Sequence, residues 1–180
     1  MYRKCATEVS TLHQHQVTQS LLELMQKMPY EDITVTQLCQ AAGVTRRVFY
    51  HLFSSKSGAL HALIDGKVLA LESVRTDTSD ELLRFFCYWK EQKLFLDVMQ
   101  KNALSGFLLE RMIEQALQED YDIRYWLRSN GWPNNDREAI IFGFTGLMGL
   151  VYSWHYTDYQ KPPEEMAEVV KQMIHPQFYK

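Results

Sequence analysis

Residues 33–60, ITVTQLCQAAGVTRRVFYHLFSSKSGAL, decide the fold because they read as two short helices joined by a tight turn. Thr34 is expected to cap the first helix, and Gln37, three residues later, completes a capping box. Gly43 suits the left-handed conformation in which many helices end. Thr45 then caps a second helix, which is predicted to run from residue 46 to about 53. Two capped helices so close together predict a helix-turn-helix, which places its second helix in the major groove of DNA.

The second helix divides its side chains in the way that DNA reading requires. Phe49 and Phe53 are four residues apart and are expected to face the core. Arg46 and Arg47 occupy the first turn, where positive charge is unfavourable to the helix dipole, so a phosphate or guanine partner would explain them. Three further polar side chains of this stretch suit phosphate oxygens, namely Tyr50, His51 and Lys56.

With the residues before it, this stretch resembles the DNA-binding region of the TetR family of bacterial transcriptional regulators. The family pattern, (I/T)TV..IA..AGVS...(F/L)Y.HF..K..L, is matched by residues 17–60, about a quarter to a third of the chain. The resemblance implies that Arg46 and Arg47 lie over bases. It also implies phosphate contacts from Thr36, Thr45, Tyr50, His51 and Lys56.

The charge distribution favours nucleic acid at the N-terminal third only. The whole chain of 180 residues has a net charge of −3, which is unlike a protein that coats polyanions generally. Residues 1–56 hold six Lys and Arg against four Asp and Glu, a net charge of +2, and the remainder carries −5. We therefore expect any contact with DNA to involve the N-terminal third.

Apolar residues recur at helical spacing along the rest of the chain, and no alternating strand pattern or repeat interrupts them. The fold class is predicted to be all-α. An N-terminal three-helix DNA-binding domain is expected over residues 1–56, and a helical regulatory and dimerisation domain over residues 57–180. Helices are predicted over residues 7–28, 35–42, 46–53, 57–74, 80–90, 93–104, 105–119, 121–128, 136–156 and 162–174.

Three glycines recur inside the apolar helix predicted over residues 136–156. No strand precedes them, so they do not form a nucleotide-binding loop. Each glycine costs about 1 kcal/mol of helix stability relative to alanine. Two explanations would compensate for this cost: another helix, from this chain or from a second subunit, approaches closely, or the glycines leave room beside a ligand. The TetR resemblance implies that the last two long helices pair with their copies in a dimeric four-helix bundle. The candidate interface residues are Gly143, Gly146, Gly149, Met166, Val170 and Met173.

The middle of the chain is rich in aromatic residues and methionine. Ordinary core packing accounts for most of them, and an adaptable effector pocket is the alternative interpretation. The candidate effector-binding residues are Phe86, Trp89, Met99, Phe107, Met112, Trp126 and Phe142.

Enzymatic and membrane functions find no support in the sequence motifs. There is no GxSxG, HExxH or P-loop motif, so no catalytic residue, cofactor or metal is expected. Cys5, Cys39 and Cys87 are odd in number and lack CxxC spacing, which favours a reducing cytoplasm over a disulfide framework. The longest uncharged run, residues 140–154, is shorter than the roughly 20 residues that span a bilayer.

The sequence thus predicts a cytoplasmic, homodimeric regulator that binds a near-palindromic duplex operator, most simply a repressor released by a small apolar effector. The alternative is a regulator, including an activator, whose C-terminal domain docks a partner protein.

Overall fold

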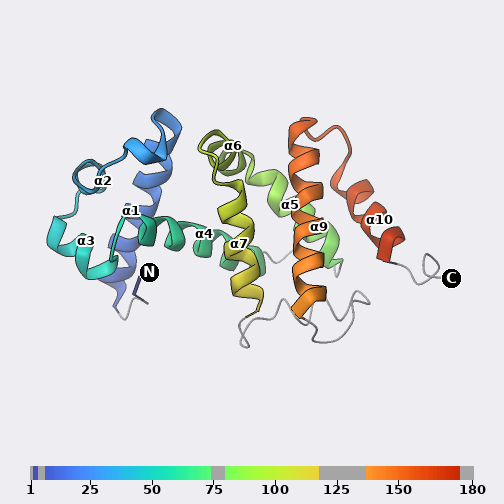
Figure 1. The fold of residues 1–180 in the computed structure, drawn as a ribbon, viewed down its shortest axis with the longest axis horizontal. Helices are drawn as coiled ribbons and strands as arrows, with labels where there is room; N and C mark the ends of the chain where they lie inside the picture. Colours follow the sequence, from blue (N-terminus) through green and yellow to red (C-terminus); the bar gives the residue numbers. More distant parts are fainter. Residues whose placement is uncertain (1, 4–6, 74–79, 118–136, 175–180) are drawn as a thin grey trace. The chain divides into compact units, whose positions relative to one another are not determined.

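This computed structural model describes residues 2–3, 7–73, 80–117 and 137–174, most of which lie in helices joined by turns (Figure 1). The predicted all-α class is confirmed. The described elements are α1 Glu8–Lys27, η1 Tyr30–Asp32, α2 Val35–Ala42, α3 Arg46–Leu52, α4 Lys56–Ser73, α5 Glu81–Glu91, α6 Lys93–Lys101, α7 Ser105–Ala116, α9 Arg137–Tyr156 and α10 Pro163–Ile174. The short 3-10 helix η1 was not predicted. The helix predicted over 121–128 lies outside the described residues.

The described residues fall into two compact units whose boundary lies inside three helices. The first unit contains the chain up to Val68 together with Asp97–Ser105. The second contains Leu69–Leu96 and the chain from Gly106 onward. Helices α4 and α6 therefore each contribute residues to both units, and α7 contributes its first residue, Ser105, to the first unit and the rest to the second. The domain division predicted at residues 56 and 57 stays a prediction.

The first unit is built around α1, which packs against α2 and α3. Val17, Leu21 and Met25 follow each other at four-residue spacing along α1, and all three are fully buried. Leu38 of α2 and Phe49 of α3 cover this face and are also fully buried. One hydrophobic core thus holds the three N-terminal helices, as the apolar spacing predicted.

The turn between α2 and α3 forms as its residue types require. The hydroxyl of Thr34 accepts a hydrogen bond from the backbone N–H of Gln37, and the Gln37 side chain accepts one from the N–H of Thr34, completing the predicted capping box. Gly43 ends α2 with φ +65°, a conformation that glycine adopts without steric cost. Thr45 then caps α3 by accepting from the N–H of Val48.

The core of the second unit is aromatic, with α5 packed against α10 and α9. Phe86 and Trp89 of α5 are fully buried, and the ring of Phe86 meets that of Trp154 of α9 edge to face at 5.6 Å between centroids. Asp80 caps α5 and also forms an ion pair with Lys171 of α10. Apolar packing and the Asp80–Lys171 ion pair therefore join α5 to α10.

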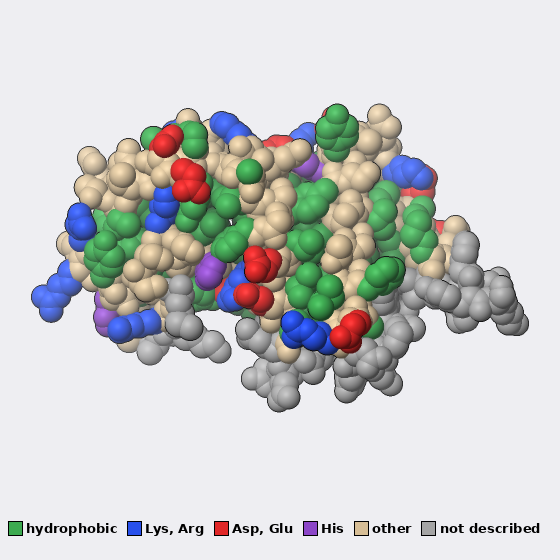
Figure 2. Space-filling model, viewed as in Figure 1, with side chains coloured by type: hydrophobic (Ala, Val, Ile, Leu, Met, Phe, Trp, Pro, Cys, Tyr) green, Lys and Arg blue, Asp and Glu red, His purple; other side chains and the backbone are tan. Residues whose placement is uncertain are grey.

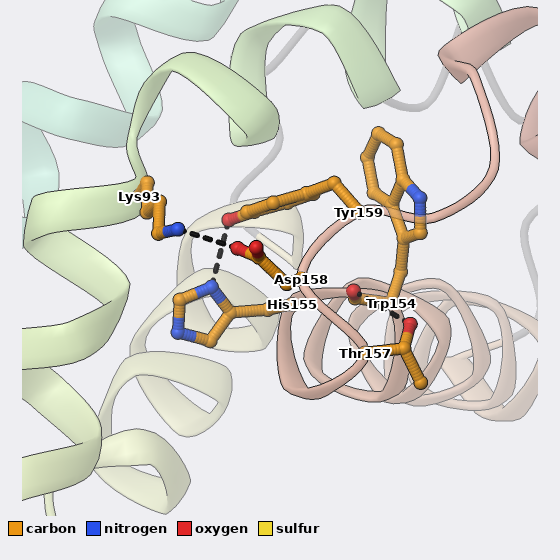
Figure 3. Close-up of polar contacts among 6 residues, drawn as sticks. All are labelled: Lys93, Trp154, His155, Thr157, Asp158 and Tyr159. Atoms are coloured by element: carbon orange, nitrogen blue, oxygen red, sulfur yellow. Dashed lines mark hydrogen bonds and ion pairs between the residues drawn. The ribbon is translucent and has the colours of Figure 1, made fainter.

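The turn that follows α9 is fixed by a group of polar contacts (Figure 3). Asp158 and Tyr159 both have left-handed backbones, with φ values of 52° and 56°. Such residues cost about 1–2 kcal/mol each, so surrounding contacts must hold them. The Tyr159 hydroxyl lies 2.8 Å from Nδ1 of His155, and Nζ of Lys93 lies 2.6 Å from Oδ1 of Asp158. This turn sets the direction in which the chain leaves α9.

Candidate nucleic-acid interface

Helix α3 has one buried side and one exposed side. Phe49 and Leu52 are buried, and the ring of Phe49 packs on that of Phe53 at 5.2 Å between centroids. The opposite side exposes four of the predicted DNA-binding residues, namely Arg46, Arg47, Tyr50 and His51. Figure 2 shows basic side chains projecting at the position of α3. Burial of the aromatic side thus presents the polar side to solvent.

Arg46 is held by residues of two helices. Its Nη1 donates a hydrogen bond to Oγ1 of Thr36 on α2 at 3.2 Å. Its guanidinium carbon lies 5.8 Å from the centre of the Tyr50 ring, one turn further along α3. The structure therefore brings together three of the predicted DNA-binding residues on a surface shared by α2 and α3. Arg47 and Thr45 are exposed beside them.

Lys56, another predicted phosphate contact, is partly engaged inside the first unit. Its Nζ donates to the backbone carbonyls of Tyr30 at 2.6 Å and Glu31 at 3.0 Å. The same ammonium lies 4.3 Å from the centre of the Tyr30 ring. Burial raises the pKa of Tyr30 to about 12, with the charge of Glu31 adding to the shift. An ammonium has three donors, so two contacts leave one for a phosphate oxygen.

Residues before α1 hold the end of α3, which sequence reasoning missed. The backbone N–H of Arg3 donates to the carbonyl of Leu52 at 3.0 Å, and Tyr2 forms an isolated β-bridge with Phe53. The Tyr2 hydroxyl donates to Oδ2 of the buried Asp65 at 2.6 Å. Each contact joins residues about 50 or more positions apart, so no local pattern signals it.

The predicted effector residues occupy different environments. Four are fully or almost fully buried, namely Phe86, Trp89, Met99 and Met112. Phe107 is half-buried, whereas the Phe142 side chain is 69% exposed. Met99 lies in the first unit, and Trp126 lies outside the described residues. Phe86 and Trp89 share α5. Their role in effector binding stays a prediction.

The predicted interface residues are split between core and surface. Met166, Val170 and Gly143 are buried within the chain. Gly146 and Gly149 are exposed, and a Cβ added at either would meet no atom within 4 Å. Met173 is 56% exposed. Contact with the described residues of this chain therefore does not explain Gly146 and Gly149. The interface itself stays a prediction.

Among the described residues, no group of three or more His, Cys, Asp or Glu is arranged to hold a metal ion. None of their helices combines the length and apolar character needed to cross a membrane.

Comparison with known proteins confirms the family resemblance. Residues 19–63 match the family model described as "Bacterial regulatory proteins, tetR family". The first unit thus carries a TetR-type helix-turn-helix domain. A search of curated proteins gives no match. Among seven matching solved chains is the "Dihydroxyacetone kinase operon activator DhaS", at 17% identity and a TM-score of 0.54, over 92% of this chain and 95% of that one. At this identity the match shows a shared fold.

Proposed function

We propose that this TetR-type transcriptional regulator is a cytoplasmic homodimer that binds a near-palindromic duplex operator through α3. The observation that carries the proposal is the shared surface of α2 and α3, on which Arg46 contacts both Thr36 and Tyr50 beside the exposed Arg47. Guanidinium groups bind the O6 and N7 atoms of guanine in the major groove, and the hydroxyls suit phosphate oxygens.

Selection from random duplexes tests DNA binding directly. The full chain should enrich a near-palindrome whose half-sites lie about 34–36 Å apart, or a multiple of that distance, because each subunit of the proposed dimer places one α3, the reading helix, in the major groove. Arg47→Ala should reduce the enrichment. Arg137→Ala is the matched control, because it removes one exposed positive charge from the second unit. Absence of any enriched sequence at modest salt would contradict the proposal.

The exposed side of α9 supports the proposed dimer. Phe142 and Tyr156, near the two ends of α9, are 69% and 82% exposed. Gly146 and Gly149 lie between them and leave open space in which another helix can approach. Figure 2 shows hydrophobic side chains along the visible face of α9. A second copy of α9 would cover this apolar surface, which explains the glycines without a ligand.

The aromatic core of the second unit supports a small, mostly apolar effector. Phe86, Trp89 and Met112 bury side chains of the kind that line ligand sites. Nε1 of Trp89 is buried and has no hydrogen-bond partner among the described residues, so an effector with one acceptor atom would satisfy it. We propose release from the operator as the result of binding, which makes the protein a repressor.

A titration of small aromatic compounds tests the effector proposal. Binding should change tryptophan fluorescence, raise the melting temperature and lower operator affinity together, since one ligand shifts one equilibrium. Trp89→Phe should weaken binding of compounds that carry an acceptor more than binding of those that lack one. A screen that leaves melting temperature and operator affinity unchanged would contradict this proposal.

The alternative function is a regulator whose second unit docks a partner protein. The solved chain that shares this fold is named an operon activator. Activation is therefore the alternative to repression. A reporter gene controlled by the selected operator separates the two. Deletion of a repressor raises expression, whereas deletion of an activator lowers it.

A further inference from the structure

The side chain of Asn102, at the end of α6, makes three hydrogen bonds inside the first unit. Its Oδ1 accepts from the backbone N–H of Tyr30 at 2.6 Å. Its Nδ2 donates to the carbonyl of Met25 at 3.2 Å and to that of Val98 at 2.8 Å. The side chain therefore joins α6 to both the end of α1 and the start of η1.

These bonds complete the C-terminus of α1, whose last carbonyls have no partner within the helix. Asn102 serves the carbonyl of Met25, and Nζ of the neighbouring Lys101 donates to the carbonyl of Gln26 at 2.9 Å. The two capping residues are more than 70 positions away in sequence. The DNA-binding unit is thus completed by a segment that lies far outside residues 19–63.

Tyr30 connects Asn102 to Lys56, which follows α3 closely in the sequence. Its N–H is held by Asn102, whereas its carbonyl and ring are held by Lys56. Lys56 is the first residue of α4, four positions after α3 ends at Leu52. Asn102 and Lys56 therefore hold the same residue from two sides.

We infer that Asn102 is a positioning residue for DNA binding, which acts through Tyr30 and Lys56 on the orientation of α3. This inference rests on the proposed function. Because α1 packs against both α2 and α3, loosening its C-terminal end changes the support of the reading helix. Asn102 sets operator affinity without touching DNA, and a shift of the α6 end alters that affinity.

The test compares Asn102→Ala with Gln100→Ala in the full chain, using the duplex recovered by selection. Gln100 is the matched control because it is exposed on the same helix. Operator affinity is measured where circular dichroism shows every variant fully folded. Asn102→Ala should lower affinity roughly 2- to 30-fold, the range seen for residues that act on a site from a distance, and Gln100→Ala should not. The salt dependence should stay unchanged, because no phosphate contact is lost.

A double substitution identifies the route through Tyr30. Asn102→Ala and Lys56→Met should combine to less than the product of their separate fold-changes, because each loosens the same residue. A purely structural role would lower the melting temperature and leave the affinity of the folded protein unchanged. Either that result or independent effects of the two substitutions would overturn the inference.

Asn102→Asp replaces the alanine variant if the latter does not fold. It keeps an acceptor for the Tyr30 N–H and removes the donors to Met25 and Val98, so affinity should still fall. Unchanged affinity in this variant also counts against the inference. A wild-type chain that enriches no duplex refutes the proposed function, and the inference with it. If the wild-type chain binds the selected duplex and the Asn102 variant binds it with the same affinity, the inference alone is refuted.

Discussion

Arg46 and Arg47 are neighbours in sequence but differ in how the fold treats them. Arg46 already contacts Thr36 and Tyr50, so it would lose less side-chain freedom in the proposed contact with DNA. Arg47 is exposed in the first turn of α3. The fold thus orders the Arg46 guanidinium in advance of the proposed DNA contact, whereas the Arg47 guanidinium would become ordered on binding.

Alanine substitution of each arginine should relax specificity at one base position. The expected cost is about 1–3 kcal/mol on the selected operator and less on operators changed at the base that the arginine reads. Binding of each variant to a series of single-base operator changes measures this. An equal loss on every sequence would assign that arginine to phosphate contact instead.

Lys56 combines a structural role with the predicted phosphate contact. Two of its three donors serve the carbonyls of Tyr30 and Glu31. Lys56→Ala should weaken binding to all sequences similarly and lower the slope of log affinity against log salt by about one per subunit. Affinity measured from low to moderate salt tests this. A weakened variant with the wild-type slope would limit Lys56 to its contacts with Tyr30 and Glu31.

At the scale of the elements, the carboxylate of Asp80, at the start of α5, forms an ion pair with Lys171 of α10. Partial burial acts to raise the pKa of Asp80, but hydrogen bonds from Lys171 and from the N–H of Leu83, with the charge of Lys171, hold it below its ordinary value of 3.8. A carboxyl with a lowered pKa stabilises the folded state above its unfolded pKa and loses that contribution as pH falls through the folded value. The ion pair should therefore stabilise the protein at neutral pH and cease to do so in acid.

Asp80→Asn isolates the ion pair, because asparagine keeps the helix cap. The variant should lose at most about 1 kcal/mol at pH 7, since both charged groups are partly exposed. The difference from wild type should shrink progressively below about pH 4. Urea unfolding at several pH values measures it, and Lys171→Met, which leaves the cap intact, should give the same profile. A difference that persists at pH 2 would show that the cap, and not the ion pair, was lost.

At the scale of the whole molecule, α9 connects the apolar pattern of the sequence to assembly. Figure 1 shows it as one unbroken helix through its three glycines. Its buried side is satisfied within the chain by packing against α5. Its exposed side, with Gly146 and Gly149, is the surface that a second subunit would cover.

Gly146→Arg should convert the proposed dimer to a folded monomer. The added side chain has room in the single chain, and arginine favours the helix by nearly 1 kcal/mol over glycine, so folding should survive. The same side chain would occupy the space of the second α9. Sedimentation should show a wild-type dimer and a monomeric variant at micromolar concentration, and the variant should bind the palindromic operator more weakly. A wild-type monomer, or a variant that remains dimeric, would exclude this surface as the interface.

The sequence by itself determined the elements whose causes are local. A capping box needs residues three apart, a helix end needs one glycine, and a buried helix face needs apolar residues at four-residue spacing. Thr34, Gly43, Thr45 and the apolar face of α1 therefore behave as predicted. The residues exposed on α3 follow from the same periodicity.

Only the tertiary structure decided which distant residues complete the first unit. The hydrogen bond between Tyr30 and Asn102 joins positions 72 apart, and the one between Tyr2 and Asp65 joins positions 63 apart. Such contacts depend on how whole helices pack, and isolated asparagines and tyrosines carry no periodic signal. Packing also separates the predicted effector residues, because Trp89 is buried and Phe142 is exposed although both are aromatic. Composition gives a residue's type, whereas burial depends on which neighbouring helix covers it.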